Sequence, residues 1–135
     1  MPSMPRRLAL CLALWAVSLI GLMGLAPQAA RAQSIKILVQ SSPLAGFQYY
    51  AGKAQWGDMH EGDKLTLVRE PDNAHDANAV RVEWQSVKLG YLPRAENRAV
   101  AEEMDKGGKV EARIARLTQH RNPWKRVLVD VYLGL

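Results

Sequence analysis

The stretch that decides the fold runs from Arg69 to Val80 and reads R-E-P-D-N-A-H-D-A-N-A-V. It joins two segments, 64–70 and 78–84, in which apolar and polar side chains alternate. Such alternation is typical of strands with one buried face. Asp and Asn side chains hydrogen-bond nearby backbone groups and therefore favour turns. Taken alone, the stretch predicts a turn between two strands, and a binding role requires a second motif.

Alternation continues outward from this stretch on both sides. A tight connection at Gln85-Ser86 leads from 78–84 into another short strand, so these two strands are expected to pair as a hairpin. The segment 109–118 fits both a helix and a strand, and the strand is favoured because 126–133 supplies a partner. Strands are thus predicted at 35–40, where a Ser-Ser-Pro turn follows, and at 64–70, 78–84, 87–92, 109–118 and 126–133.

One segment has helical spacing instead. Pro93 suits the first turn of a helix, and Gly107-Gly108 ends the segment. Apolar side chains recur between them at Ala95, Ala99, Val100 and Met104. The expected fold class is therefore mainly β (α+β), with about six strands and one main helix. A closed or partly open barrel would bury one face of each strand and remove most exposed edges.

The first 32 residues are predicted to be a secretory signal. Arg6-Arg7 precede an apolar run from Leu8 to Ala26, and Ala30-Arg31-Ala32 fits the pattern that a signal peptidase cleaves. Cleavage is therefore expected before Gln33, with a periplasmic or secreted location. The apolar run is also about long enough to span a bilayer, so a membrane anchor that is not cleaved stays the alternative.

Removal of this signal would change the composition. Arg6, Arg7 and Arg31 would leave, so 15 of the 18 basic residues would face 13 acidic ones and the net charge would fall from +5 to about +2. The only cysteine, Cys11, would leave as well, and no disulfide could form. Residues 33–135 suffice for one domain with one modest core, expected to be a monomer.

The second motif is L-G-Y-L-P-R at Leu89–Arg94, which leads into the predicted helix and its exit M-D-K-G at 104–107. With the stretch at 69–80 and G-F-Q-Y-Y at 46–50, this order of motifs resembles the HIRAN domain, a module known from DNA-repair helicase-like proteins. The resemblance covers nearly all of residues 35–133. It implies an OB-like β-barrel that holds the 3′ end of single-stranded DNA.

The resemblance implies roles for the polar residues of the loop. Asn73 and Asp76 fall where the family hydrogen-bonds the terminal nucleotide and its free 3′ hydroxyl. A carboxylate suits this position because it accepts a hydrogen bond from a hydroxyl and repels a terminal phosphate. His75 lies where an aromatic side chain would stack.

Further positions would form the rim of the same site. Tyr49 falls where the family places an aromatic that contacts a base or the backbone, and its neighbour Tyr50 is expected to pack inward. Tyr91 and Arg94 would meet the sugar and phosphates, and Trp124 would support a base from a loop. Flat rings and cations are what single-strand binding without sequence preference requires.

Two departures from the family pattern stand out. Gln48 occupies a position where helicase-associated members carry an arginine, which should weaken a phosphate contact unless Lys53 or Arg94 compensates. The chain also has no P-loop, cysteine pair or Gly-x-Ser-x-Gly elbow, so neither an enzyme nor a cofactor is predicted. A metal site at Asp58, His60 and Glu61 is conceivable, but their spacing matches no standard zinc or calcium loop.

Basic residues gather late in the chain, with only Glu111 among them and Trp124 embedded in the group. They fit a solvated strand face and a nucleic-acid patch equally well. The members are Lys106, Lys109, Arg113, Arg116, Arg121, Lys125 and Arg126. Trp56 and Trp84 are predicted to belong to the core instead.

Two functions follow from the sequence. The first is a nucleic-acid-binding module for single-stranded DNA with a preference for a free 3′ end. The second is an exported interaction module that binds a protein, glycan or cell-envelope ligand through the same groove. The motifs favour the first, whereas the signal and Gln48 favour the second.

Overall fold

A computed structural model describes residues 34–135 of the chain. The predicted signal, its cleavage site before Gln33 and the alternative of an uncleaved anchor lie outside the described residues. Residues 33–135 form a compact unit of their own. Within the described part of the chain, no helix is long and apolar enough to cross a membrane.

The mainly β fold predicted from the sequence is confirmed. The strands are β1 (Lys36–Pro43), β2 (Lys64–Glu70), β3 (Ala79–Trp84), β4 (Val87–Tyr91), β5 (Lys109–Leu117) and β6 (Val127–Gly134). The α-helices are α1 (Gly52–Gln55) and α2 (Arg98–Asp105), and the 3₁₀ turns are η1 (Phe47–Tyr49), η2 (Trp56–Asp58) and η3 (Pro123–Lys125). The segment that fitted both helix and strand is β5, because β6 pairs with it along its length.

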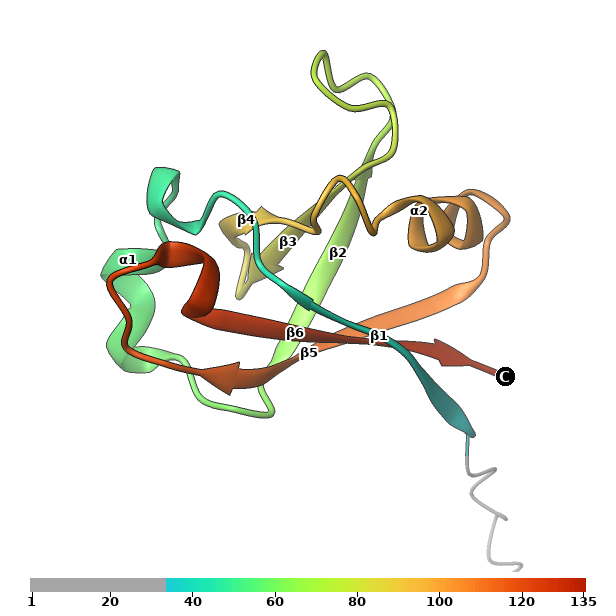
Figure 1. Cartoon of the computed structure of the whole chain (residues 1–135). Coiled ribbons are helices and arrows are strands. Elements are labelled where there is room, and N and C mark those ends of the chain that lie inside the picture. The colour runs from blue at the N-terminus through green and yellow to red at the C-terminus, as the bar shows by residue number, and fades with distance from the viewer. Residues whose placement is uncertain (1–33) are drawn as a thin grey trace, which may run out of the picture. The chain divides into compact units, whose positions relative to one another are not determined.

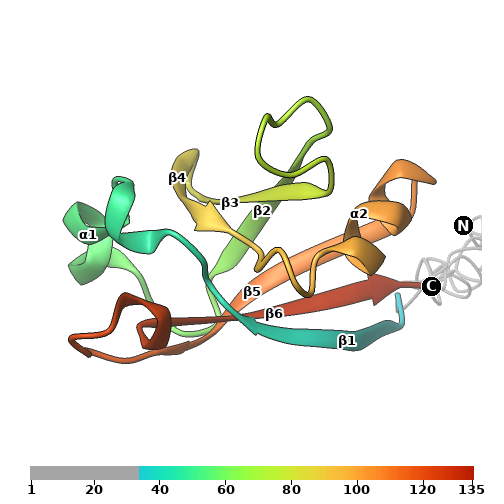
Figure 2. The same cartoon turned by 45° about the horizontal axis from the view of Figure 1, so that its top comes forward.

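The six strands form one antiparallel sheet in the order β1-β6-β5-β2-β3-β4 (Figure 1). Strand β2 belongs to both halves: Lys64 and Leu65 pair with β5, and the rest of the strand pairs with β3. The two ends of the sheet meet where Ala45 and Tyr91 exchange two backbone hydrogen bonds of 2.9 Å each. The sheet is therefore a barrel closed at one point, as in a small OB-like fold. The short helices lie at opposite ends of it (Figure 2).

The core lies inside this barrel and follows the predicted alternation. Val80, Val82 and Trp84 of β3 are at most 5% exposed, so the core position predicted for Trp84 is confirmed. Burial of such side chains stabilises the fold by about 1.5–3 kcal/mol each. The hairpin predicted at Gln85-Ser86 is also confirmed. Both residues have positive φ, at 45° and 66°, as a two-residue turn with the twist of the sheet requires.

Two local predictions were wrong, and one short helix was missed. Strand β1 continues through the predicted turn at Ser41-Ser42-Pro43, because Ser42 is buried and its hydroxyl donates to Glu96 at 2.6 Å. Helix α2 begins at Arg98 and not near Pro93, whose carbonyl instead accepts a turn hydrogen bond from the Glu96 N–H. Helix α1 was missed, because four residues are too short to show a helical period.

Candidate nucleic-acid interface

The β2–β3 loop is held in shape by its own Asn and Asp side chains. Asn73 Oδ1 accepts hydrogen bonds from the backbone N–H groups of His75, at 2.9 Å, and Asp76, at 3.2 Å. Asp76 Oδ1 accepts from the Asn78 N–H at 2.9 Å. The predicted turn chemistry is therefore present, and it fixes the two side chains that the sequence also assigned to binding.

Arg69 anchors this loop to the end of α2. Its guanidinium forms a two-point ion pair with Asp105, with Nε and a terminal nitrogen at 2.9 and 3.1 Å from the two carboxylate oxygens. The same guanidinium donates to the backbone carbonyls of Ala77 and Ala79. Its hydrogen bond to Asp105 lowers the pKa of that carboxyl. The first residue of the stretch at 69–80 and the Asp of the M-D-K-G exit at 104–107 are thus partners in one ion pair.

Glu70 organises the polar side chains beneath the loop. Its carboxylate accepts from Asn73 at 3.0 Å, from the Tyr91 hydroxyl at 2.8 Å and from Arg81 at 2.6 Å. Partial burial raises the pKa of Glu70, but the hydrogen bonds from these three donors outweigh it, and the pKa lies below its ordinary value. Lys88 donates to the Tyr91 hydroxyl at 2.8 Å, so that hydroxyl is held between a cation and a carboxylate.

Asp76 is held from behind by Asn97. The Asn97 Nδ2 group donates to Asp76 Oδ2 at 2.7 Å, and Asn97 is only 1% exposed. Its own Oδ1 is buried without a hydrogen-bond donor among residues 34–135. Each Asp76 oxygen therefore accepts one hydrogen bond from the protein, whereas a carboxylate offers about four acceptor sites in all. The Asp76 carboxylate can therefore accept a further hydrogen bond from a ligand.

Side chains of this loop and of the strands beside it line a hollow of about 310 Å³, named here the first cavity. It brings together residues that the sequence assigned to DNA binding, namely Asn73, His75, Asp76, Tyr91 and Arg94. Its remaining lining is Ala45, Tyr50, Ala79 and Leu92. The cavity thus lies beside the Ala45–Tyr91 bridge that closes the barrel.

The other predicted site residues do not line this cavity. Gln48 and Tyr49 lie in η1, where Gln48 is exposed and Tyr49 is 78% exposed. Trp124 lies in η3, 47% exposed, beside a separate hollow that Arg116 and Lys125 also line. These aromatic side chains are open to solvent, but the structure does not gather them with Asp76.

Tyr50 is the cavity residue that the sequence analysis missed. It was expected to pack inward, yet its ring lines the first cavity and packs edge-on against Tyr91, with ring centres 6.0 Å apart. Lys88 Nζ lies 4.1 Å from the centre of the Tyr50 ring and 4.5 Å from that of Tyr91. The pair Tyr49-Tyr50 was the only signal, and the 3₁₀ turn decides which ring faces the cavity.

Two further expectations concern other parts of the domain. Trp56 was predicted to belong to the core. It packs edge-on against Phe47 but is only half-buried, so it lies at the margin of the core. Within residues 34–135, no group of three His, Cys, Asp or Glu side chains could hold a metal ion. Among the conceivable ligands, Glu61 instead accepts a backbone hydrogen bond from Leu117.

The described residues thus form a small β-barrel with a polar and aromatic hollow where it closes. The family model of the HIRAN domain matches residues 37–135, and the chain belongs to this family. HIRAN is a binding domain, and membership of the family supports nucleic-acid binding in general.

Solved structures agree with this assignment. A protein from Lactobacillus plantarum is 26% identical to this chain with a TM-score of 0.63, and the match covers 75% of this chain and 96% of that one. The HIRAN domain of human HLTF is 23% identical with a TM-score of 0.56, covering 73% of this chain and 79% of that one. The HLTF likeness supports the fold alone. No curated protein matches the chain significantly.

Proposed function

We propose that this domain binds the 3′ end of single-stranded DNA, with the terminal nucleotide in the first cavity and its free 3′ hydroxyl on Asp76. The observation that supports the proposal is the gathering of Asn73, His75, Asp76, Tyr91 and Arg94 around one hollow. Family membership supports nucleic acid as the ligand class.

Asp76 would read the chemistry of the end. Its carboxylate is oriented by Asn97 and Asn78 and can accept a further hydrogen bond from a hydroxyl. A terminal phosphate has no such proton to offer when ionised, and its negative charge would face that of the carboxylate. The cavity would therefore favour a 3′ hydroxyl over a 3′ phosphate.

The remaining lining would hold the nucleotide itself. Tyr50, Tyr91 and His75 offer rings for the base or sugar, and Arg94 offers a cation for the phosphate that precedes the terminal nucleotide. Arg94 lines the first cavity and Lys53 does not, so Arg94 is the better substitute for the arginine that Gln48 replaces.

Fluorescence anisotropy with residues 33–135 tests the proposal. Labelled oligonucleotides of about ten nucleotides, the scale of an OB-type site, would carry a 3′ hydroxyl or a 3′ phosphate, and a blunt duplex would serve for comparison. We expect the 3′ hydroxyl strand to bind at least about tenfold more tightly, since a hydrogen bond to a charged group contributes about 1.5–3 kcal/mol. Binding of that strand should also weaken between about 50 and 200 mM salt.

Asp76→Ala should remove the preference for the 3′ hydroxyl, while Asp72→Ala, in the exposed turn of the same loop, should retain it. A retained preference in Asp76→Ala would assign end recognition to another group. Equal binding of 3′ phosphate strands and duplex ends to the unchanged protein would show that the domain does not read 3′ ends at all.

We further propose that the protein is exported, on the basis of residues 1–32. Cell fractionation with mass spectrometry of the mature N-terminus should find the protein outside the cytoplasm beginning at Gln33. The neutral Gln48 side chain, exposed on η1, supports the alternative of a protein, glycan or envelope ligand. A partner that co-purifies from the exported fraction and survives nuclease would favour that alternative, and loss of every partner after nuclease would count against it.

A further inference from the structure

A second hollow of about 310 Å³ lies between η1, α1 and the connection from β5 to β6. We name it the second cavity. Its lining is Phe47, Lys53, Trp56, Gln119, His120 and Arg126. It shares no lining residue with the first cavity, and no residue in it belongs to the motifs at 69–80 or 89–94.

Aromatic rings form the apolar part of the second cavity. Phe47 and Trp56 pack edge to face, with ring centres 5.8 Å apart and planes at 68°. Phe47 is 1% exposed, and a Cβ atom added to Gly52 would lie 2.3 Å from its ring. The ring is thus backed closely by the chain, whereas Trp56 is only half-buried. Phe47 therefore supports the Trp56 ring from within the core, and Trp56 offers the accessible apolar surface of the kind on which a nucleobase packs.

Three basic side chains share the cavity with these rings. Arg126 donates from Nε to the His120 carbonyl at 2.7 Å and from a terminal nitrogen to the Arg121 carbonyl at 3.2 Å, which orients the guanidinium and leaves further N–H groups. His120 Nδ1 accepts the Asn122 N–H at 2.9 Å, so a neutral His120 carries its proton on Nε2 and donates from there. Lys53 adds an ammonium group.

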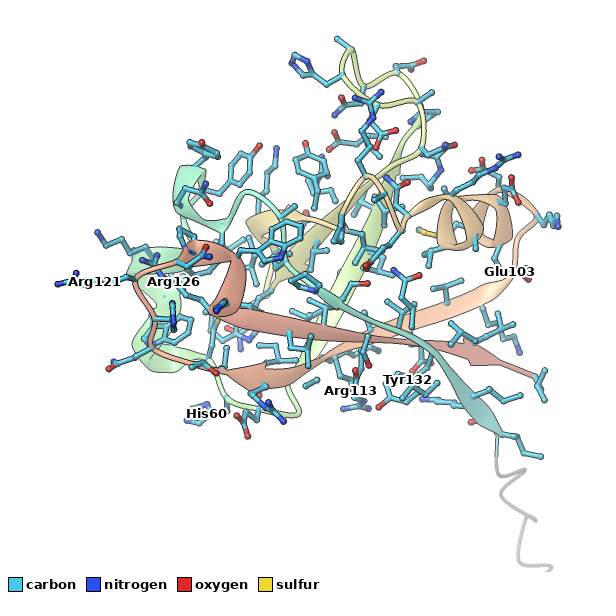
Figure 3. The ribbon with its side chains drawn as sticks, viewed as in Figure 1. His60, Glu103, Arg113, Arg121, Arg126 and Tyr132 are labelled. Carbon is cyan, nitrogen blue, oxygen red and sulfur yellow. The ribbon has the colours of Figure 1, made fainter. Side chains whose placement is uncertain are left out.

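The charged side chains that line this cavity are all basic. Its lining within the described residues includes no Asp or Glu. None of the ion pairs formed within residues 34–135 involves Lys53, Arg121 or Arg126. Figure 3 shows Arg121 and Arg126 at the end of the barrel beside α1, away from Arg113 along β5 and Glu103 on α2. Of the late basic residues, Arg126 lines the second cavity, and Arg116 and Lys125 line the hollow beside Trp124.

From these observations we infer that the second cavity binds a nucleotide unit, with the base against Trp56 and the phosphate held by Lys53, His120 and Arg126. A phosphate without a ring would leave the aromatic surface unused, and an apolar ring without a phosphate would leave the donors unused. The nucleotide unit could come from an internal position of a DNA strand or from a free mononucleotide. The inference rests on the second cavity alone and does not require 3′-end binding in the first.

The test measures tryptophan fluorescence of a protein of residues 33–135 that carries Trp124→Phe. Only Trp56 and Trp84 then remain, and Trp84 is buried, so a ligand in the second cavity should quench Trp56. The probe is 2′,3′-dideoxyadenosine 5′-monophosphate, which has no 3′ hydroxyl for Asp76. We expect it to quench Trp56 saturably and to bind at least about tenfold more weakly to Lys53→Gln. Lys106→Gln, an exposed lysine beside α2, is the matched control and should bind as the parent does.

Comparison ligands separate the parts of the inference. Dideoxyadenosine without phosphate and inorganic phosphate without a base should each bind much more weakly than the nucleotide. Equal binding of the nucleotide and the nucleoside, or no saturable binding of the nucleotide, would overturn it. Asp76→Ala should leave this binding unchanged, so failure of the proposed 3′-end function and failure of the second cavity can be told apart.

The source of the nucleotide unit follows from oligonucleotide length. If the unit belongs to a strand whose 3′ end lies in the first cavity, Lys53→Gln should weaken binding of a strand of about ten nucleotides and leave a dinucleotide unaffected. If the unit is a free mononucleotide, Lys53→Gln should leave binding of both strands unchanged while still losing the mononucleotide. Either pattern supports the second cavity, and retained mononucleotide binding in Lys53→Gln would reject it.

Discussion

The two cavities of this barrel have the same volume, about 310 Å³, but the first is lined by charges of both signs, Asp76 and Arg94, and the second, within residues 34–135, only by cationic and neutral side chains. The first contains the Asp76 carboxylate and lies on the hydrogen-bond network of Glu70. The second has Lys53, His120 and Arg126 and, among the described residues, no acidic side chain in its lining. Size therefore does not distinguish them. Under the two proposals, the first cavity pairs a hydroxyl with Asp76 and a phosphate with Arg94, whereas the second binds a phosphate with no acidic side chain in its described lining.

A single short segment separates the two cavities. Phe47 lines the second, and Tyr50, which follows η1 directly, lines the first. Each cavity also has a glycine that leaves no room for a side chain. Gly90 lies against the Ala45 carbonyl beside the first cavity, and Gly52 lies against the Phe47 ring beside the second. Substitutions at these positions should therefore affect the cavities separately.

The largest effect is expected from Gly90→Val. A Cβ atom at Gly90 would lie 2.2 Å from the Ala45 carbonyl oxygen, so the bridge between Ala45 and Tyr91 could not keep its geometry. We expect a loss of about 3 kcal/mol in the free energy of unfolding, the upper range for overpacking, measured by urea denaturation. Gly57→Ala, where an added Cβ meets nothing within 4 Å, is the control. Unchanged stability in Gly90→Val would show that the barrel is not closed there.

A smaller effect is expected from Gly52→Ala, because the added methyl group would meet the Phe47 ring at 2.3 Å. The ring must shift toward the second cavity, at a cost of about 1–2 kcal/mol. Nucleotide binding to the second cavity should weaken, and the preference for a 3′ hydroxyl should remain. Loss of both properties would show that the cavities are coupled through η1.

Arg69→Lys should loosen the loop of the first cavity. Lysine cannot reproduce the two-point contact with Asp105 together with the hydrogen bonds to Ala77 and Ala79. The free energy of unfolding should fall only slightly, because Asp105 is exposed and such ion pairs contribute little. Hydrogen exchange should show faster opening of the β2–β3 loop, with the second cavity unaffected. Slower or unchanged exchange there would contradict the anchoring role.

The smallest effect concerns the pH dependence that Glu70 confers. Its pKa in the folded protein lies below the ordinary value of 4.5. The carboxylate therefore stabilises the fold fully above about pH 4.5, and this contribution is lost as the pH falls through the lower folded-state value. Glu70→Gln should have a flatter stability profile in that acidic range, as measured by thermal denaturation. An equally steep profile would assign the acid sensitivity to other carboxyls.

Local patterns were sufficient to predict the strands and the polar loop between β2 and β3. The alternation at 64–70 and 78–84 and the turn residues between them act over a few residues, so strands β2 and β3 and their loop could be predicted directly. The hydrogen-bonding capacity of Asn73 and Asp76 is likewise a property of the side chains themselves. The start of α2 was predicted too early, because a turn closed by the Glu96 N–H and the Pro93 carbonyl precedes the helix, whose N-cap is Asn97.

The sequence by itself determined a mainly β domain and the polar residues at its β2–β3 loop, since periodicity and side-chain chemistry are local. Only the tertiary structure decided that Tyr50 and not Tyr49 faces the first cavity, that Arg69 binds Asp105, and that residues near 50 and 120 enclose a second cavity. These contacts join segments far apart in the chain. They depend on how the barrel closes, which no local pattern specifies.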